Sequence, residues 1–232
     1  RGFAQRRKQL KKQLPDGAPW EETAAALGLP VTSRAEELNL VQWVELTRAC
    51  DPHPLKDLPQ KSGEIFDVVD SEDNVVGRKT RGEVHANKLL HRAVHVFVFN
   101  KRGDLLLQQR SMFKDAHPGV WDSSVSGHLD AGEDYLPAAI RELDEEMGIR
   151  VDEAPEEIAR IAACENTGWE HVRVYQTKHS GSVKFPAAEV EAAAWFPLAE
   201  LEEWIAARPD DFASGFIECW NAFRKSPTCS AK

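Results

Sequence analysis

The spacing of hydrophobic and polar residues changes near residue 63 and divides the chain into two parts. Before that point, apolar residues recur at helical spacing, which predicts three short helices over residues 3–14, 19–27 and 35–48. Residues 51–62 are polar and rich in proline, as is typical of a linker. We therefore predict a small all-helical module at residues 1–50, a linker at 51–62 and a second domain at 63–232.

The third predicted helix carries its own start signal. Ser33 and Glu36 have the spacing of a capping box, a pair of side chains that bond to the first free backbone N–H groups of a helix. The apolar residues of this helix are expected to form one buried side, made by Leu38, Leu40, Val41, Val44 and Leu46.

The second domain is predicted to consist of strands around one strong helix. Short apolar runs bounded by turn residues predict strands at 65–69, 92–100, 105–110, 158–165 and 171–178, with the clearest hairpin at 92–110. A helix is predicted over Asp134–Met147, ended by Gly148, and later helices at 198–206 and within 211–224. Strands interleaved with a central helix favour an α/β sandwich over a helical bundle.

Charge and composition narrow the class of protein. The net charge of −9 is uneven: residues 1–62 carry +2 and residues 63–232 carry −11, so the second domain is a poor general binder of nucleic acid. No apolar run approaches the roughly 18–20 residues that a membrane span needs. The four cysteines are scattered, without a C-x-x-C pair, which favours reduced thiols in a cytoplasmic protein over a zinc site.

The helix at 134–147 carries the clearest chemical signal. Glu142, Glu145 and Glu146 are spaced i, i+3 and i+4, so their carboxylates are expected on one helix face, where a divalent cation with oxygen ligands would offset their repulsion. Arg141 is expected to pair with Glu133 and hold the preceding loop against the helix. Gly127 and Gly132 are expected to permit backbone bends that direct carbonyl groups toward the same cation.

A glutamate-rich helix face alone usually marks a solvated surface, so the complete pattern decides the interpretation. The chain reads Gly127-(x5)-Glu133-(x7)-Arg141-Glu142-Leu143-Asp144-Glu145-Glu146-Met147-Gly148-Ile149. Such fixed identities at fixed spacing are expected by chance with a probability on the order of 10⁻⁶ or less.

This pattern resembles the Nudix signature G-x5-E-x7-R-E-U-x-E-E-x-G-U, in which U is apolar, and every position matches. The resemblance covers roughly residues 64–201 and includes Trp195-Phe196-Pro197-Leu198, which is similar to the usual lead into the closing helix. It implies an α/β/α sandwich, a Mg²⁺ or Mn²⁺ cofactor and attack of water on a small-molecule diphosphate. It also implies roles for particular residues: Glu142 and Glu146 as metal ligands assisted by Glu145 and the Gly127 carbonyl, Glu133 and Arg141 as organisers of the loop, and Glu145 or Glu170 as the general base.

Residues 121–128, with residues 90–94, resemble the branch that contains type I isopentenyl-diphosphate isomerases and related bacterial hydrolases. Those isomerases carry a catalytic cysteine where this chain has Ser126, and their signature diverges where this one is complete. A serine hydroxyl is a far weaker proton donor than a thiol, whose pKa is roughly 8.5. Hydrolysis is therefore favoured, with isomerisation as the alternative.

The same resemblance implies further binding residues. The isomerases bind a metal through histidines that correspond approximately to His85, His91 and His128, and Glu170 matches one of their glutamates. We predict His91, His128, Glu170 and Arg110 as substrate or second-metal residues. Lys101, Arg102 and Lys114 are further candidates for phosphate contacts, and Trp169 for stacking on a base, although such residues more often serve solubility or packing.

Residues 1–50 resemble the C-terminal helical domain of rRNA adenine dimethyltransferases of the KsgA type, through F-x-Q-R-R-K near the start and R-A-E-E-L at residues 34–38. The resemblance implies rRNA contact through Arg6, Arg7, Lys8 and Lys11. The cofactor loop of the methyltransferase is absent and the sequence does not begin with Met, so we expect the C-terminal part of a dimethyltransferase–Nudix fusion. The remaining alternative is an RNA- or ribosome-docking module with a non-catalytic Nudix fold. The substrate and the oligomeric state are not predicted.

Overall fold

The computed structural model describes residues 9–12, 14, 20–39, 42–43, 46 and 63–226. The chain divides into two compact units, Arg1–Leu58 and Pro59–Lys232. The predicted linker at 51–62 lies outside the described residues.

The first unit has a small apolar core built on one helix. Helix α1 spans Trp20–Ala26, in agreement with the second predicted helix, and Gly28 ends it with a φ of 66° that favours glycine. The Trp20 indole N–H donates to the Val31 carbonyl oxygen at 2.8 Å. Six side chains form the buried cluster: Leu10, Trp20, Ala24, Ala35, Leu38 and Leu46.

The structure describes only part of the first predicted helix, and there it has one helical turn in place of a continuous helix. Gln9 forms an isolated β-bridge with Arg34, and the Leu10 N–H donates to the Ser33 carbonyl at 2.9 Å. Only Leu10–Lys12 follows, as a short 3₁₀ helix labelled η1. Pairing of Gln9 with Arg34 replaces helical bonds at the start of this stretch. Residues 3–8 and 13 of the predicted helix lie outside the described residues.

The third predicted helix is interrupted rather than continuous. A 3₁₀ turn, η2, spans Ala35–Glu37, and Leu38 then adopts extended backbone with φ −87° and ψ 133°. The Gln42 N–H donates to the Asn39 side chain at 2.9 Å, and the Asn39 N–H donates to the Gln42 side chain at 3.0 Å. This reciprocal capping starts a new helical segment after Leu38, so the predicted Ser33 start signal was the wrong one.

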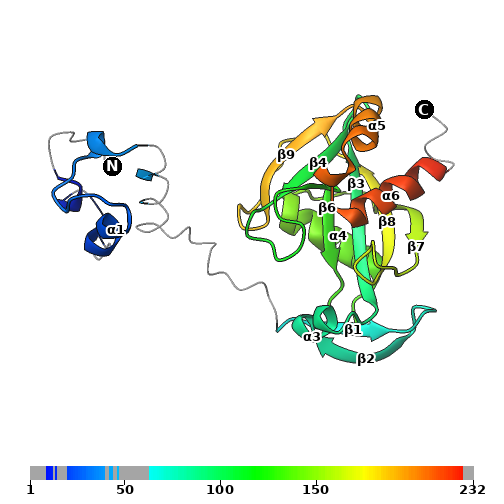
Figure 1. The fold of residues 1–232 in the computed structure, drawn as a ribbon. Coiled ribbons are helices and arrows are strands. Elements are labelled where there is room, and N and C mark those ends of the chain that lie inside the picture. The colour runs from blue at the N-terminus through cyan, green and yellow to red at the C-terminus, as the bar shows by residue number, and fades with distance from the viewer. Residues whose placement is uncertain are drawn as a thin grey trace. The chain divides into compact units, whose positions relative to one another are not determined.

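The second unit is an α/β/α sandwich, as the sequence predicted (Figure 1). Its strands are β1 (Ile65–Val69), β2 (Val75–Thr80), β3 (His91–Phe99), β4 (Leu105–Arg110), β5 (Trp121–Asp122), β6 (Val125–His128), β7 (Glu156–Ile161), β8 (Glu170–Lys178) and β9 (Val190–Phe196). Its helices are α3 (Arg81–Ala86), α4 (Tyr135–Met147), α5 (Leu198–Ala207), the 3₁₀ turn η3 (Pro209–Asp211) and α6 (Ser214–Lys225).

The main sheet has seven strands in the order β5-β4-β3-β8-β7, with β6 paired to β3 and β9 paired to β4. Strand β3 is central and separates two cores, because its side chains point to alternate faces. Val94, Val96 and Val98 belong to the core under α4, whereas Phe97 and Phe99 belong to the core under α5 and α6.

Helix α4 follows the predicted boundaries closely. The Asp134 side chain accepts from the Tyr135 N–H at 2.8 Å, and Gly148 ends the helix in the left-handed conformation with a φ of 63°. The strand predicted at 158–165 is wrong at both ends, since β7 spans Glu156–Ile161. Strand β2 was missed because nearly all of Val75–Thr80 is exposed, which leaves no alternation of buried and polar residues to detect.

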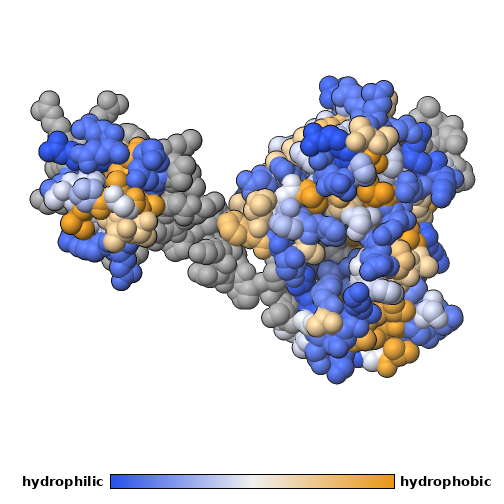
Figure 2. Space-filling model, in the orientation of Figure 1, coloured by the Kyte–Doolittle hydropathy of each residue, from blue (hydrophilic) through white to orange (hydrophobic). Residues whose placement is uncertain are grey.

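Strands β1 and β2 form a separate antiparallel hairpin, followed by α3. Exposed Ile65, Val75 and Val76 lie on this hairpin, and Figure 2 shows hydrophobic surface at this end of an otherwise largely hydrophilic face. Among the residues that the structure describes, no helix has the length and apolar character needed to cross a lipid bilayer.

Candidate active site

Helix α4 buries two of its three signature glutamates. Glu142 is 9% exposed and Glu146 is 7% exposed, whereas Glu145 is exposed. Residues four apart lie above one another on a helix, so Glu142 and Glu146 share the side that faces the sheet while Glu145 lies at its margin. The three carboxylates are therefore neighbours, but only two of them are withdrawn from water.

The sheet supplies the partners of Glu146. The Gln108 amide donates to Glu146 Oε2 at 2.9 Å, and the Ser126 backbone N–H donates to the same oxygen at 3.1 Å. Burial raises the pKa of Glu146, and the nearby charges of Lys114 and Arg110 act in the opposite direction. Gln108 was not predicted. It is 1% exposed in the structure, and the sequence shows only that this polar residue directly follows the apolar run 105–107.

Arg141 organises the other side of the carboxylate cluster. Its Nε and Nη2 donate to the two oxygens of Glu133 at 3.0 and 2.8 Å, and its Nη1 donates to Glu142 at 2.7 Å and Glu145 at 3.2 Å. Nη2 also donates to the His128 backbone carbonyl at 3.1 Å. One planar guanidinium thus joins the loop, the helix and strand β6, and the Arg141–Glu133 pair predicted from spacing is present.

Gly127 serves a different purpose from the predicted one. It lies inside β6 and is not among the residues with positive φ, so the expected backbone bend is wrong at this position. A β-carbon at Gly127 would instead lie 2.2 Å from the Glu142 carboxyl carbon. Glycine is required here because Glu142 occupies the space of a side chain. Gly132, with a φ of 83°, does adopt a conformation that favours glycine.

The carboxylate cluster fits a divalent cation. Burial and the neighbouring charge of Glu146 raise the pKa of Glu142 to about 8. Two buried carboxylates that oppose each other's ionisation need a positive partner beyond Arg141, and all the side-chain donors available are oxygens of the kind that Mg²⁺ and Mn²⁺ prefer.

A second cluster, of three histidines, lies at the start of β3. Metal-ligating nitrogens of His85, His91 and His128 all lie within 4.8 Å of one another. The His91 Nδ1–H donates to the Leu89 carbonyl at 2.9 Å, which leaves Nε2 as a lone pair, buried and without a hydrogen-bond partner among the described residues. In the sequence, His85 corresponds only approximately to a metal-binding histidine of the isomerases. In the structure, helix α3 places it beside His91 and His128.

Glu170 joins the histidine cluster through the parallel pairing of β3 with β8, in which His91 is opposite Glu170. His128 Nε2 lies 2.9 Å from Glu170 Oε1, and His91 Nε2 lies 3.5 Å from the same oxygen. Burial alone would raise the pKa of Glu170, but the histidines outweigh it and hold that pKa well below its ordinary value. Burial lowers the pKa of His128, and burial together with the neighbouring histidines lowers the pKa of His85 to about 4.

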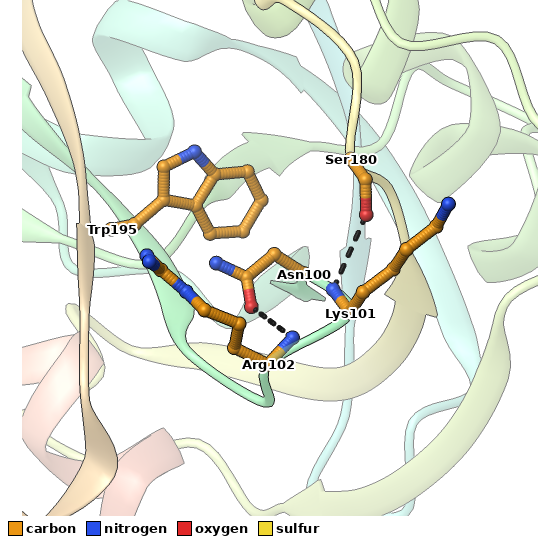
Figure 3. A pocket seen from close by; sticks show the side chains of 5 residues that line it. All are labelled: Asn100, Lys101, Arg102, Ser180 and Trp195. Atoms are coloured by element: carbon orange, nitrogen blue, oxygen red, sulfur yellow. Dashed lines mark hydrogen bonds between the residues drawn. The ribbon is translucent and has the colours of Figure 1, made fainter.

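The predicted cationic residues fall into two groups. Arg110 pairs with buried Asp122 at 3.0 Å, and Lys114 forms an ion pair with Glu189. The positive charges of Arg110 and Lys114 both lower the pKa of Glu146. Lys101 and Arg102 instead belong to the turn after β3, at the far end of the strand from Gly127, which pairs with Val94. There they line a shallow pocket of about 280 Å³ together with Asn100, Ser180 and Trp195 (Figure 3). The structure therefore places Lys101 and Arg102 away from the carboxylate cluster.

The structure also shows the contacts of Ser126, Trp169 and Lys11, which the sequence analysis singled out. The Ser126 hydroxyl donates to Asp122 at 3.2 Å. Trp169 is half-buried with the Lys88 ammonium 5.8 Å from its ring centre, so the ring already has a cation beside it. Lys11 forms an exposed ion pair with Glu21. Arg6, Arg7 and Lys8 lie outside the described residues.

The comparisons with known proteins agree with this fold. The NUDIX domain family matches residues 89–215, more than half of the chain, and the chain therefore belongs to the NUDIX family. Its domain is a Nudix hydrolase domain, and hydrolases of this family generally use divalent metal ions. The family resemblance stated from the signature is thus confirmed.

Relatives include both isomerases and hydrolases. Isopentenyl-diphosphate Delta-isomerase of Serratia proteamaculans is 32% identical over 157 residues, 66% of this chain and 88% of the relative. An uncharacterised Nudix hydrolase of Streptomyces coelicolor is 34% identical over 154 residues, 63% of this chain and 84% of the relative. The crystal structure of DR0079 from Deinococcus radiodurans has a TM-score of 0.56 and 28% identity, and covers 62% of this chain and 90% of that one.

Proposed function

We propose that the chain hydrolyses a diphosphate linkage in a nucleoside diphosphate derivative, with Mg²⁺ or Mn²⁺ bound at Glu142 and Glu146. The observation that carries the proposal is the pair of buried carboxylates on consecutive turns of α4, set within a complete signature. A divalent cation at this position neutralises diphosphate charge and lowers the pKa of a bound water.

Individual side chains of the site are assigned separate roles in this proposal. Glu142 and Glu146 bind the cation, with the Gly127 carbonyl and Glu145 assisting, while Arg141 fixes Glu142 and Glu133. Arg110 and Lys114 add positive charge beside the cluster for the substrate's phosphates. Glu145 is the better candidate for the general base, because it is exposed to incoming water beside Glu142, whereas Glu170 is hydrogen-bonded to His128 in the other cluster.

A panel of nucleoside diphosphate derivatives, assayed with Mg²⁺ and with Mn²⁺, tests this function. Wild-type protein is expected to release phosphate-containing products only with the metal present. Glu146→Gln is expected to lower kcat by about a hundredfold or more while the fold is kept, because it removes the charge of one ligand. Glu203→Gln makes the same chemical change on the exposed side of α5 and is the matched control. Full activity in Glu146→Gln would reject the site.

We further propose that His85, His91, His128 and Glu170 hold a second cation or a substrate group. Support comes from the unpartnered lone pair of buried His91, which faces the Glu170 carboxylate across 3.5 Å. Two such electron-rich atoms repel each other unless a positive species lies between them. Imidazole and carboxylate ligands together suit Zn²⁺ or Mn²⁺.

Isomerisation of a diphosphate is the second candidate function, favoured by the name of the relative from Serratia proteamaculans and by the histidine cluster. Ser126 speaks against it, since its hydroxyl is bonded to Asp122 and is a poor acid. Incubation with isopentenyl diphosphate in heavy water separates the two functions. Hydrolysis without deuterium uptake into carbon is expected, and uptake would favour the isomerase.

For residues 1–50 we propose an rRNA-contacting module, in which Arg6, Arg7, Lys8 and Lys11 meet phosphates, within a dimethyltransferase–Nudix fusion. The support is the basic run in the sequence. RNA binding that weakens steeply with salt, measured for the full chain and for a variant with these four residues changed to Gln, is the test. Equal binding by the two would reject the contact. Tight RNA binding with no hydrolysis of any diphosphate would favour a docking module instead. The coding sequence upstream of residue 1 tests the fusion, which predicts a dimethyltransferase catalytic domain there.

A further inference from the structure

Asp67 lies on β1, sixty residues before the signature, yet it contacts the signature loop. The Gly132 N–H donates to Asp67 Oδ2 at 2.7 Å, and the Arg78 side chain donates to Asp67 Oδ1 at 2.9 Å. Asp67 is only 6% exposed, so its carboxylate depends on these donors in place of water. The contact is reinforced by the Ala131 N–H, which donates to the Ile65 carbonyl at 3.0 Å.

The residue bound by Asp67 adjoins one that orients the carboxylate cluster. Gly132 precedes Glu133, whose two oxygens accept from Arg141 at 3.0 and 2.8 Å. Arg141 in turn donates to Glu142 at 2.7 Å. Gly132 is held at a φ of 83°, a conformation that is easily lost when the backbone is released. A short series of contacts thus leads from the β1 strand to a buried carboxylate of α4.

We infer that Asp67 is a positioning residue for the Nudix site: as a hydrogen-bond acceptor at a fixed position, it holds the Gly132 backbone and through it Glu133, Arg141 and Glu142. The inference rests on the proposed function for its effect on turnover. Its effect on cation binding needs no substrate. The segment before residue 89, where the family match begins, therefore contributes to the site of this chain.

Three substitutions distinguish a role of Asp67 as hydrogen-bond acceptor from a role as negative charge. Asp67→Ala removes the acceptor, and Asp67→Glu keeps the charge but moves it by one methylene. Asp67→Asn removes the charge and keeps one oxygen that can accept from the Gly132 N–H, while its amide NH2 cannot accept from Arg78, whose exposed side chain can turn to water instead. If the position of the accepting oxygen is what matters, Asp67→Ala and Asp67→Glu weaken Mn²⁺ binding and lower kcat by about tenfold, with little change in KM. The Mn²⁺ affinity and kcat of Asp67→Asn then stay within about threefold of wild type.

Asp70→Ala is the matched control. Asp70 lies at the end of the same hairpin, but its carboxylate accepts from Glu72 and Asn74 within the turn and does not contact the loop. It is expected to lower stability without changing Mn²⁺ affinity. Circular dichroism verifies that each variant folds, and the comparison of Asp67→Glu with Asp67→Asn decides the matter even if Asp67→Ala does not fold.

Mn²⁺ binding is measured by electron paramagnetic resonance with the metal alone, and turnover with the diphosphate panel. Weak binding in Asp67→Glu with near-normal binding in Asp67→Asn supports the inference. Wild-type binding in Asp67→Glu, or equal losses in Asp67→Asn and Asp67→Glu, would overturn it. A wild-type protein that binds Mn²⁺ but hydrolyses nothing would count against the proposed function and leave this comparison intact.

Discussion

A β-carbon at Gly127 would lie 2.2 Å from the carboxyl carbon of Glu142 and 2.7 Å from its Cγ, both closer than non-bonded atoms approach. The glycine of β6 and the glutamate of α4 therefore occupy one space between strand and helix. Since Glu142 is also bound by Arg141, it cannot move away without breaking that ion pair.

Gly127→Ala is accordingly expected to displace Glu142, to lower kcat by about tenfold or more and to lower the free energy of unfolding by about 1–3 kcal/mol. Activity assays and urea denaturation measure the two effects. Gly77→Ala is the control, because a β-carbon at Gly77, on β2, meets nothing within 4 Å. If Gly127→Ala behaves like Gly77→Ala, the close packing of Glu142 against β6 is wrong.

Arg141→Lys is expected to reduce activity even though it conserves the charge. A lysine ammonium cannot reproduce the parallel bonds to Glu133 together with the bonds to Glu142 and the His128 carbonyl. We expect kcat to fall by about tenfold and more metal to be needed for half-maximal rate. Arg150→Lys, at an exposed pair with Asp144, is expected to change neither quantity. Equal activity in the two variants would argue against the guanidinium fork.

The contribution of Glu142 to the stability of the metal-free protein is expected to fall as the pH rises from about 4.5 to about 8. Burial and Glu146 raise the pKa of Glu142 to about 8, whereas the unfolded chain releases that proton near 4.5. Within this window the folded state binds more protons, so the contribution of Glu142 to the free energy of unfolding is complete below the window and is lost above it.

Saturating Mg²⁺ is expected to reverse this trend, because the cation binds the ionised carboxylate. Tm measured with and without Mg²⁺ at pH 6, 7 and 8.5 provides the test, and the increase in Tm on adding Mg²⁺ should grow with pH. An increase that is the same at each pH would argue that Glu142 is not a ligand.

The histidine cluster is expected to add a second cation site. Isothermal titration of the wild type with Mn²⁺ or Zn²⁺ should resolve two binding events, of which His85→Asn weakens one by about tenfold or more. His85 is the most exposed of the three histidines, with only its ring edge against the other two, and its substitution is expected to leave the fold unchanged. His117→Asn, at an exposed histidine outside the cluster, is the matched control. A single binding event that His85→Asn does not change would exclude a cation at the three histidines.

Sequence and structure differ most where burial is unequal along an element. The spacing of Glu142, Glu145 and Glu146 predicted one acidic face, but it could not separate the two buried carboxylates from exposed Glu145. Their burial depends on the strand that lies opposite α4, and on Gln108 and Ser126 within that sheet. Likewise, Gly127 and Gly132 look alike in the signature, while one is needed for space and the other for its φ.

The sequence by itself determined the Nudix family, the α/β/α sandwich, the extent of α4 and the Arg141–Glu133 pair, because these depend on local spacing, helix caps and a contiguous motif. Tertiary structure alone decided the contact of Asp67 with Gly132 and the separation of Lys101 from the carboxylates. These relationships depend on strand register and on the packing of a hairpin against a loop. Neither leaves a periodic trace in the chain, since the partners are far apart in sequence and each alone looks like an ordinary polar residue.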